Sequence, residues 1–164
     1  MKKLNFMGIG PKVGIIVLPW LAVVIFLTVK FKSSFAYFAD SNRILFFTGL
    51  VIVIAGSLIY FLTVPVMLKG LIKTKLITTG TYYLCCNPLY ASIILLIIPG
   101  LSLMMNSWLI LTTSIIGYIL LKTFIKSEYE EMEKVFGDDF RKYRLETPEF
   151  FPLPYKKLLK KVRD

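Results

Sequence analysis

The sequence predicts an all-α polytopic membrane protein with about four transmembrane helices, including a short C-terminal hairpin, and a cytoplasmic amphipathic helix after them. Two observations lead to this prediction. Hydrophobic residues make up 56% of the 164 residues, and the mean hydropathy of +0.69 is too high for an ordinary soluble domain of this size. The apolar residues are also gathered into uncharged runs long enough to cross a bilayer. We therefore treat residues 1–164 as a single membrane domain.

The first two apolar runs predict membrane helices at residues 13–29 and 44–68. The first is barely long enough, since a crossing needs about 20 residues. The second contains Gly49 and Gly56, which lie two helical turns apart and would let another helix pack closely. Charged and aromatic residues are mixed between the two runs, which is typical of a segment in the headgroup layer.

Residues 76–90 are polar and rich in turn-forming residues, although the apolar run that follows them carries no charge as far as Leu121. Backbone groups that leave a helix at membrane depth are tolerated only where protein or a water-filled cavity covers them. We therefore expect this stretch to be covered by the rest of the chain and to line a site.

The apolar run after this stretch is interrupted at Pro99-Gly100 and again at residues 105–107. Two short membrane helices, residues 89–105 and 107–121, explain it better than one long helix. Four crossings bring the chain back to its starting side, where the positive-inside tendency places the flanking lysines. We expect an integral, multi-pass protein whose N- and C-termini are both cytoplasmic.

Residues 122–164 are expected to form a cytoplasmic helix and tail. Apolar residues recur there at helical spacing, at Ile125, Tyr129, Met132 and Phe136, while glutamates occupy the other faces. Gly137 suits the C-terminal cap of this helix, and a short helical turn is expected after it. The basic residues at 156–163 predict contact with anionic lipid headgroups.

Several function classes are excluded by composition. Without any histidine, His-based general base catalysis and most zinc sites are not available, and we expect no metal. The two cysteines, Cys85 and Cys86, are adjacent, which favours packing roles over a disulfide. The net charge of +10 is spread in patches beside the apolar runs, so the bilayer is the expected partner rather than nucleic acid.

A candidate site emerges where the start of the helix near Pro88 meets the acidic helix, because the hairpin brings them to one membrane face. The N-terminal end of a helix attracts a carboxylate, and Glu128 could bind an amine or a pair of hydroxyls. The alternative is structural: Gly80 and Pro88 shape a loop, the tyrosines belong to an interfacial belt, and the glutamates form a solvated face.

The order of these residues adds a resemblance. About the last 90 residues resemble the isoprenylcysteine carboxyl methyltransferase and phospholipid methyltransferase family. The resemblance rests on five features in order: Leu76-Ile77-Thr78-Thr79-Gly80-Thr81-Tyr82, Asn87-Pro88-Leu89-Tyr90, an uncharged hairpin, Glu128, and the segment from Phe136 to Tyr143. The resemblance implies methyl transfer from S-adenosylmethionine to a lipophilic acceptor. It also implies that the cofactor lies on the cytoplasmic side beneath the hairpin.

Carried over residue by residue, the cofactor contacts implied by the resemblance fall on Leu76, Ile77, Tyr82, Asn87, Pro88, Tyr90 and Glu128. No catalytic residue is implied. The chain departs from the family pattern at four places: Thr74 replaces a histidine, Cys86 replaces an arginine, Tyr129 replaces the second glutamate of a pair that begins at Glu128, and Phe124 replaces the arginine that contacts the prenyl-substrate carboxylate. The last change argues against a prenylcysteine carboxylate as the substrate, although Lys122 or Lys126 could substitute.

The sequence thus predicts methyl transfer to a small lipophilic acceptor, which is a carboxylate, a thiol or a lipid headgroup, at the cytoplasmic membrane face. Two alternatives stay open. One is a non-catalytic membrane scaffold derived from the same family, which the loss of an arginine at Cys86 permits. The other is a membrane reductase using NADPH, which is less favoured because residues 76–90 lack a basic cluster for the extra phosphate.

Overall fold

The computed structural model describes residues 8–38, 43–73 and 75–151. These residues are almost entirely helical, and the only β-type pairing in this part of the chain is an isolated bridge between Ala36 and Ser107. The predicted all-α fold is therefore confirmed. The expectations for the termini, for Thr74 and for the basic tail at 156–163 fall outside the described residues.

Four apolar helical segments form the body of the molecule. Three are long and apolar enough to cross a membrane: α1 (Gly10–Lys30), the first 28 residues of α3 (Arg43–Lys73), and α6 (Trp108–Glu146). The fourth, Pro88–Met104, is shorter and consists of α4 (Pro88–Ala91), the π-helix η2 (Ser92–Ile97) and α5 (Ile98–Met104). Two short elements complete the set, α2 (Lys32–Phe35) and the 3₁₀ turn η1 (Gly80–Tyr83).

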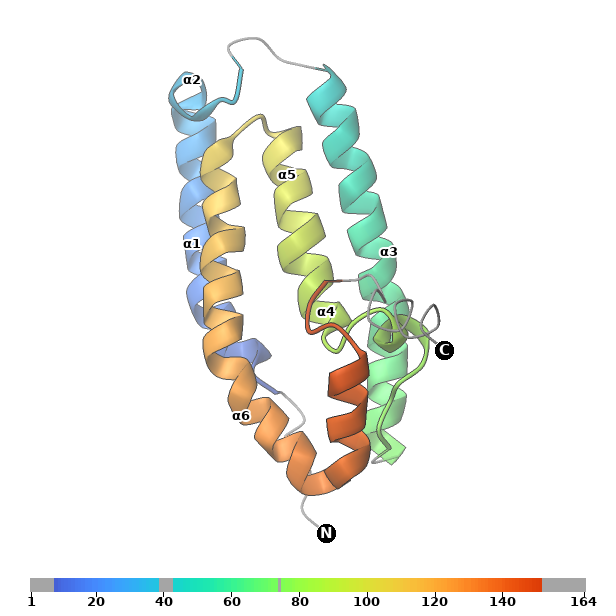
Figure 1. Cartoon of the computed structure of the whole chain (residues 1–164). Helices are drawn as coiled ribbons and strands as arrows, with labels where there is room; N and C mark the ends of the chain where they lie inside the picture. The colour runs from blue at the N-terminus through green and yellow to red at the C-terminus, as the bar shows by residue number, and fades with distance from the viewer. Residues whose placement is uncertain (1–7, 39–42, 74, 152–164) are drawn as a thin grey trace.

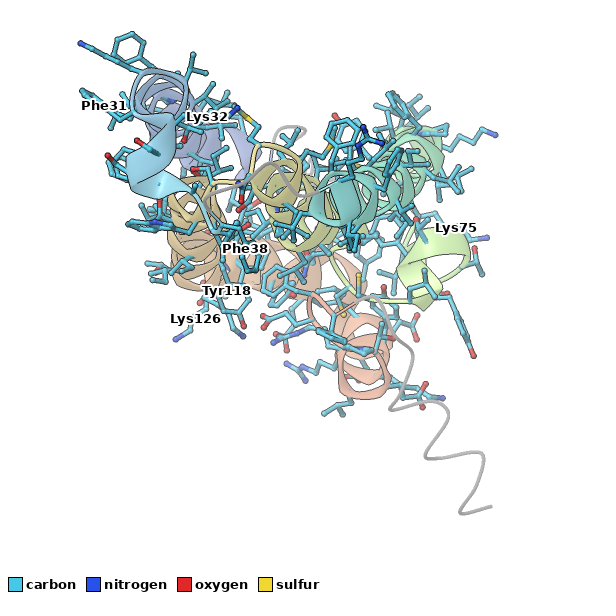
Figure 2. The ribbon with its side chains drawn as sticks, turned by 90° about the horizontal axis from the view of Figure 1, so that it is seen from above. Phe31, Lys32, Phe38, Lys75, Tyr118 and Lys126 are labelled. Carbon is cyan, nitrogen blue, oxygen red and sulfur yellow. The ribbon has the colours of Figure 1, made fainter. Side chains whose placement is uncertain are left out.

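The four segments stand side by side in the order α1, α6, α5, α3, as the two views show (Figures 1 and 2). The two end helices of this row, α1 and α3, carry many exposed apolar side chains, such as Ile15, Phe26, Val51 and Phe61. A bilayer would cover such side chains, because lipid tails are as apolar as they are. Membrane insertion therefore explains the exposed apolar surface.

Close packing between α3 and the segment Pro88–Met104 depends on small residues, as the spacing of Gly49 and Gly56 predicts. A methyl group built on Gly49 would lie 2.5 Å from the carbonyl oxygen of Gly100. One built on Gly56 would lie 2.8 Å from Cβ of Leu96. The backbones of the two helices can approach each other only because these side chains are absent.

The wide turn η2 follows directly after the residues of the candidate site. Ser114 of α6 donates a hydrogen bond to the carbonyl oxygen of Ile94 in this turn at 2.6 Å. A π-helical turn leaves a carbonyl less well aligned for the helix's own bonds, so a side-chain donor stabilises it. The bond fixes α4 and η2 against α6.

The segments expected at 107–121 and after 121 are parts of one helix in the structure. No proline interrupts α6 between Trp108 and Phe136, so the helix continues from the apolar half into the amphipathic half. The break comes at Gly137, whose φ of 56° and ψ of −131° are not helical. Residues 138–146 then run back alongside the lower part of the molecule (Figure 1).

The end of the molecule opposite this reversal is closed by Asn106, between α5 and α6. Its side-chain oxygen accepts the N–H of Tyr37 at 3.2 Å and that of Phe38 at 3.3 Å, and its amide donates to the Phe38 carbonyl at 2.9 Å. Its φ of 50° lies in the left-handed region, which asparagine tolerates better than alanine does.

Asn106→Gly and Asn106→Ala should therefore destabilise the protein to different degrees. Both lose the side-chain bonds, at a cost of about 1 kcal/mol, while only alanine adds the strain of a positive φ, worth roughly 1–2 kcal/mol. In thermal unfolding of the purified protein in detergent, the melting temperature should be highest for wild type, lower for Asn106→Gly and lowest for Asn106→Ala. An alanine variant as stable as the glycine variant would contradict the left-handed geometry.

Candidate functional site

A cavity of about 260 Å³ lies at the end of the molecule where α1 begins, α3 ends, α4 begins and the second half of α6 passes. Six of the seven residues singled out from the sequence line it: Leu76, Ile77, Tyr82, Asn87, Tyr90 and Glu128. Pro88 does not line it. It is fully buried at the first position of α4, where its fixed φ and missing N–H suit a helix start.

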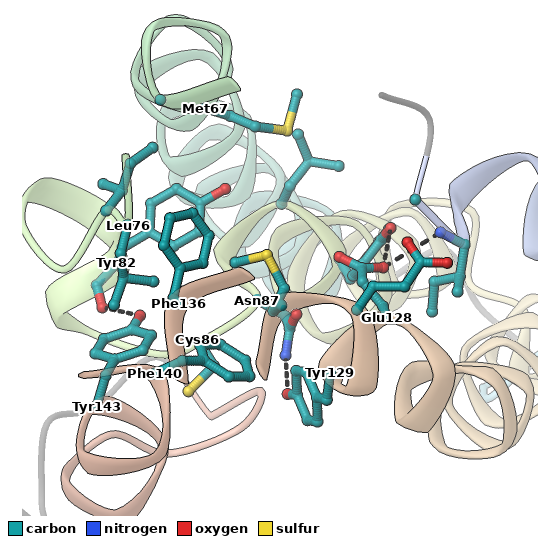
Figure 3. Close-up of a pocket in the computed structure, with 18 of the residues that line it drawn as sticks. Met67, Leu76, Tyr82, Cys86, Asn87, Glu128, Tyr129, Phe136, Phe140 and Tyr143 are labelled. Carbon is teal, nitrogen blue, oxygen red and sulfur yellow. Dashed lines mark hydrogen bonds between the residues drawn. The ribbon is translucent and has the colours of Figure 1, made fainter. Parts of the chain in front are cut away.

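One end of the cavity is aromatic. Leu76 and Tyr82 belong to the connector, residues 75–87 between α3 and α4. They lie opposite Phe136, Phe140 and Tyr143 of α6 (Figure 3). The reversal at Gly137 produces this arrangement, because it turns residues 138–146 back toward the connector. Such a wall suits a flat, weakly polar ring.

The other end of the cavity holds Glu128. Its Oε2 atom accepts the backbone N–H of Ile9 at 3.2 Å and the hydroxyl of Tyr90 at 3.3 Å (Figure 3). Burial raises the pKa of Glu128 above its ordinary value, and these two hydrogen bonds partly oppose the shift. The two hydrogen bonds therefore hold the carboxylate in place but offset only part of the free-energy cost of burying its charge. The carboxylate can thus accept further donors from a ligand.

The connector is covered by protein, as its polar composition predicts. Tyr143 donates from its hydroxyl to the carbonyl oxygen of Tyr82 at 2.6 Å, and Thr63 of α3 bonds to the hydroxyl of Thr81 at 2.9 Å. Burial, followed by the nearby charge of Glu128, raises the pKa of Tyr82 to about 12. The Tyr82 phenol is thus neutral at physiological pH.

Asn87 has a structural role that the sequence did not suggest. Its side-chain amide donates to the hydroxyl of Tyr129 and, at 3.0 Å, to the carbonyl oxygen of Glu149. The backbone N–H groups of Cys86 and Asn87 bond to the carbonyls of Pro148 and Glu149 at 2.7 and 3.1 Å. Asn87 therefore ties the start of α4 to the segment after α6.

The departures from the family pattern also have places in the structure. Cys86 lines the cavity, with its sulfur 3.6 Å from the carbonyl oxygen of Thr147. Phe124 packs against the hydrophobic core, and Lys122 forms an ion pair with Glu149. Lys126 is exposed on an outer face (Figure 2). Neither lysine thus lies free at the cavity to replace the arginine.

Cys85, the neighbour of Cys86, is fully buried. Burial raises the pKa of its thiol to about 12, so the thiol stays protonated and unreactive at neutral pH. This agrees with the expectation that it serves for packing.

The turn that leads into α1, residues 8–10 with Gly10 as the first helical residue, also lines the cavity, which the sequence did not predict. Gly8, Ile9 and Gly10 lie against the acidic end. The only signal was the pair of glycines just before the first apolar run, and glycines at such a position ordinarily indicate a turn and nothing more.

With this geometry established, comparison with known families decides the class. The family model for phospholipid methyltransferase matches residues 43–139, which is more than half of the chain. The chain belongs to the phospholipid methyltransferase family. No match was found among curated proteins or among solved structures.

The phospholipid methyltransferase family is a family of methyltransferases, which supports an enzyme and suggests methyl transfer in membrane lipid or isoprenylcysteine metabolism. The matched residues include α3, the connector, α4, α5 and α6 as far as Asp139. They therefore contain most of the cavity wall, including Glu128. The turn at Gly8–Gly10 and the aromatic residues Phe140 and Tyr143 lie outside the match.

Proposed function

We propose that this protein transfers a methyl group from S-adenosylmethionine to a small lipophilic acceptor at the cytoplasmic membrane face. The observation that supports the proposal best is the two-ended cavity, which is aromatic at Tyr82 and Phe136 and acidic at Glu128. Most of its wall, including these three residues, lies inside the family-matched region. S-adenosylmethionine likewise has a flat base at one end, with ribose hydroxyls and an ammonium group as donors further along.

The residues present fit this cofactor chemically. We assign the base to the space between Tyr82 and Phe140, and the ligand's donors to the carboxylate of Glu128. Leu89 and Tyr90, in the first turn of α4, line the cavity where a helix start favours the methionine carboxylate. The cofactor would supply an electrophilic methyl group on a sulfonium.

The protein's own part in the transfer is to position the acceptor and exclude water, because displacement at a sulfonium carbon needs in-line geometry more than proton transfer. The neutral phenol of Tyr82 is not a base at physiological pH. Glu128 and Glu131 are the carboxylates at the cavity that could take a proton. We therefore favour an acceptor that is already nucleophilic, such as a lipophilic acid or thiol, over an ammonium headgroup.

The proposed orientation places the cavity, and with it both termini, on the cytoplasmic side. The start of α1, the end of α3 and the start of α4 lie at the same end of the row of helices, as an even number of crossings requires (Figure 1). The acceptor then enters from the bilayer, whose anionic lipids we expect to contact the basic flanking segments.

Isothermal calorimetry and thermal shift with S-adenosylmethionine, its demethylated product and NADPH test the proposal on the purified protein. Binding of the first two in the micromolar range is expected. If neither S-adenosylmethionine nor its demethylated product gives a binding heat or a thermal shift, the non-catalytic scaffold is the better description. A shift with NADPH alone would favour the reductase.

A further inference from the structure

The turn before α1 makes direct contact with the acidic end of the cavity. Ile9 is only 3% exposed, and its backbone N–H donates to Oε2 of Glu128 at 3.2 Å. The bond joins residues 119 positions apart, so it fixes the start of α1 against the second half of α6. The Tyr90 hydroxyl bonds the same oxygen atom at 3.3 Å, which completes a small cluster.

The glycines on either side of Ile9 leave room for this cluster. Gly8 has a φ of +51°, a conformation that other residues rarely adopt. A methyl group built on Gly8 would lie 3.0 Å from Oε2 of Glu128 and 3.3 Å from the Tyr90 hydroxyl. One built on Gly10 would lie 3.7 Å from that hydroxyl. A side chain at Gly8 therefore requires the Glu128 carboxylate and the Tyr90 hydroxyl to shift by a few tenths of an ångström.

We infer that the turn Gly8–Gly10 is a positioning element of the ligand site, in which the Ile9 N–H aims the Glu128 carboxylate and the missing side chain at Gly8 lets the carboxylate stay there. This inference rests on the proposed function for the identity of the ligand. It adds to the site a part of the chain that lies outside the residues matched by the family.

The electrostatics of the cluster agree with this role. Burial raises the pKa of Glu128, and the bond from Ile9 lowers it, since an N–H stabilises the ionised carboxylate. Several other titratable groups lie near Glu128 or along the same cavity: Tyr90 from α4, Tyr82, Lys75 and Cys86 from the connector, Lys12 from α1, and Tyr129, Glu131 and Tyr143 from α6. The hydrogen bonds from the Ile9 N–H and the Tyr90 hydroxyl both lower the pKa of Glu128 and so favour its charged form, and the bond from Ile9 is the larger of the two effects.

The first test compares Gly8→Ala with Gly14→Ala, the same substitution in the same N-terminal region. A methyl group on Gly14 meets only Cδ1 of Leu18, at 4.0 Å. Gly8→Ala should weaken S-adenosylmethionine binding about tenfold, the value for disturbing one charged hydrogen bond, and Gly14→Ala should leave it unchanged. In a Glu128→Gln background, Gly8→Ala should change the affinity by less than about twofold, because its effect passes through Glu128.

The second test needs no ligand. Replacing the Ile9 amide by an ester, through incorporation of the α-hydroxy acid, removes the donor and little else. The pKa of Glu128 should then rise further, so the loss of thermal stability on raising the pH should extend to higher pH than in wild type. A Glu128→Gln variant carrying the same ester should lack that shift.

The outcomes separate the two proposals. A wild type that binds neither S-adenosylmethionine nor its product overturns the proposed function, while the pH dependence of the ester variant still decides whether Ile9 positions Glu128. The inference is overturned by Gly8→Ala binding as tightly as Gly14→Ala, or by an ester variant with the pH dependence of wild type.

Discussion

Glu128→Gln should weaken S-adenosylmethionine binding by about 10- to 150-fold and should raise the thermal stability of the ligand-free protein at neutral pH. The first effect follows from the loss of a charged acceptor, since hydrogen bonds to charged groups contribute about 1.5–3 kcal/mol. The second follows because glutamine can still accept the Ile9 N–H but carries no charge to bury.

The pH dependence of this stability gain has a definite sign. The folded-state pKa of Glu128 is raised, so the folded protein holds the proton more tightly than the unfolded chain. The folded protein loses stability as the pH rises from the pKa of Glu128 in the unfolded chain to its pKa in the folded protein. Above the folded-state pKa the loss stays constant. Glu128→Gln should therefore exceed wild type in stability above this window and match it in acid.

Calorimetry and thermal unfolding over a pH series measure both effects on the same samples. In wild type, ligand affinity should increase as the pH rises through the folded pKa of Glu128, and in Glu128→Gln this part of the pH dependence should vanish. Glu130→Gln is the matched control, because Glu130 is exposed on the same helix. Unchanged affinity in Glu128→Gln would mean that the assignment of Glu128 to the ligand is wrong.

Asn87→Ala is a less direct test of the site. The sequence suggested that Asn87 holds the ligand, but its side chain bonds to Tyr129 and to the carbonyl of Glu149. Removing it should loosen the segment after α6 as well as the cavity. A loss of binding in this variant would thus combine two causes, whereas Glu128→Gln keeps the local hydrogen bond.

The meeting of the connector with Glu128 could be predicted because it follows from chain length alone. A short hairpin between Leu89 and Leu121 must return the chain to the membrane face it left, and this brings Glu128 close to Tyr90. The need to cover polar backbone similarly predicted protein contacts around Thr81 and Tyr82. Both inferences used constraints that the bilayer imposes on any sequence.

Contacts between distant elements could not be predicted in this way. Nothing in the composition of Gly8–Gly10 shows that its N–H reaches a residue 119 positions away. The ion pair of Lys122 with Glu149 likewise depends on how the chain turns after α6. The sequence marked Gly137 as a helix cap but did not show that the following helix folds back onto the connector.

Gly137→Ala tests that reversal, and it should both destabilise the protein and open the aromatic end of the cavity. A methyl group on Gly137 would have nothing within 4 Å, so it meets no steric obstacle. The cost is conformational: φ of 56° with ψ of −131° is a region that residues with a side chain avoid, at roughly 1–3 kcal/mol. The relaxed backbone would move Phe140 and Tyr143 away from the connector.

Tyr143→Phe separates two consequences of Gly137→Ala: movement of the aromatic wall, and loss of the bond from the Tyr143 hydroxyl to the Tyr82 carbonyl. Tyr143→Phe removes only the hydroxyl, which bonds to the Tyr82 carbonyl and, at 3.4 Å, to the Cys85 carbonyl. It should cost about 1 kcal/mol and leave the aromatic wall in place. We therefore expect thermal stability and S-adenosylmethionine affinity to fall together in Gly137→Ala, and affinity to fall much less in Tyr143→Phe. Gly14→Ala, where the added methyl meets only Leu18 at 4.0 Å, is the control for the substitution itself. If Gly137→Ala binds the cofactor as wild type does, the returning helix is not part of the ligand site.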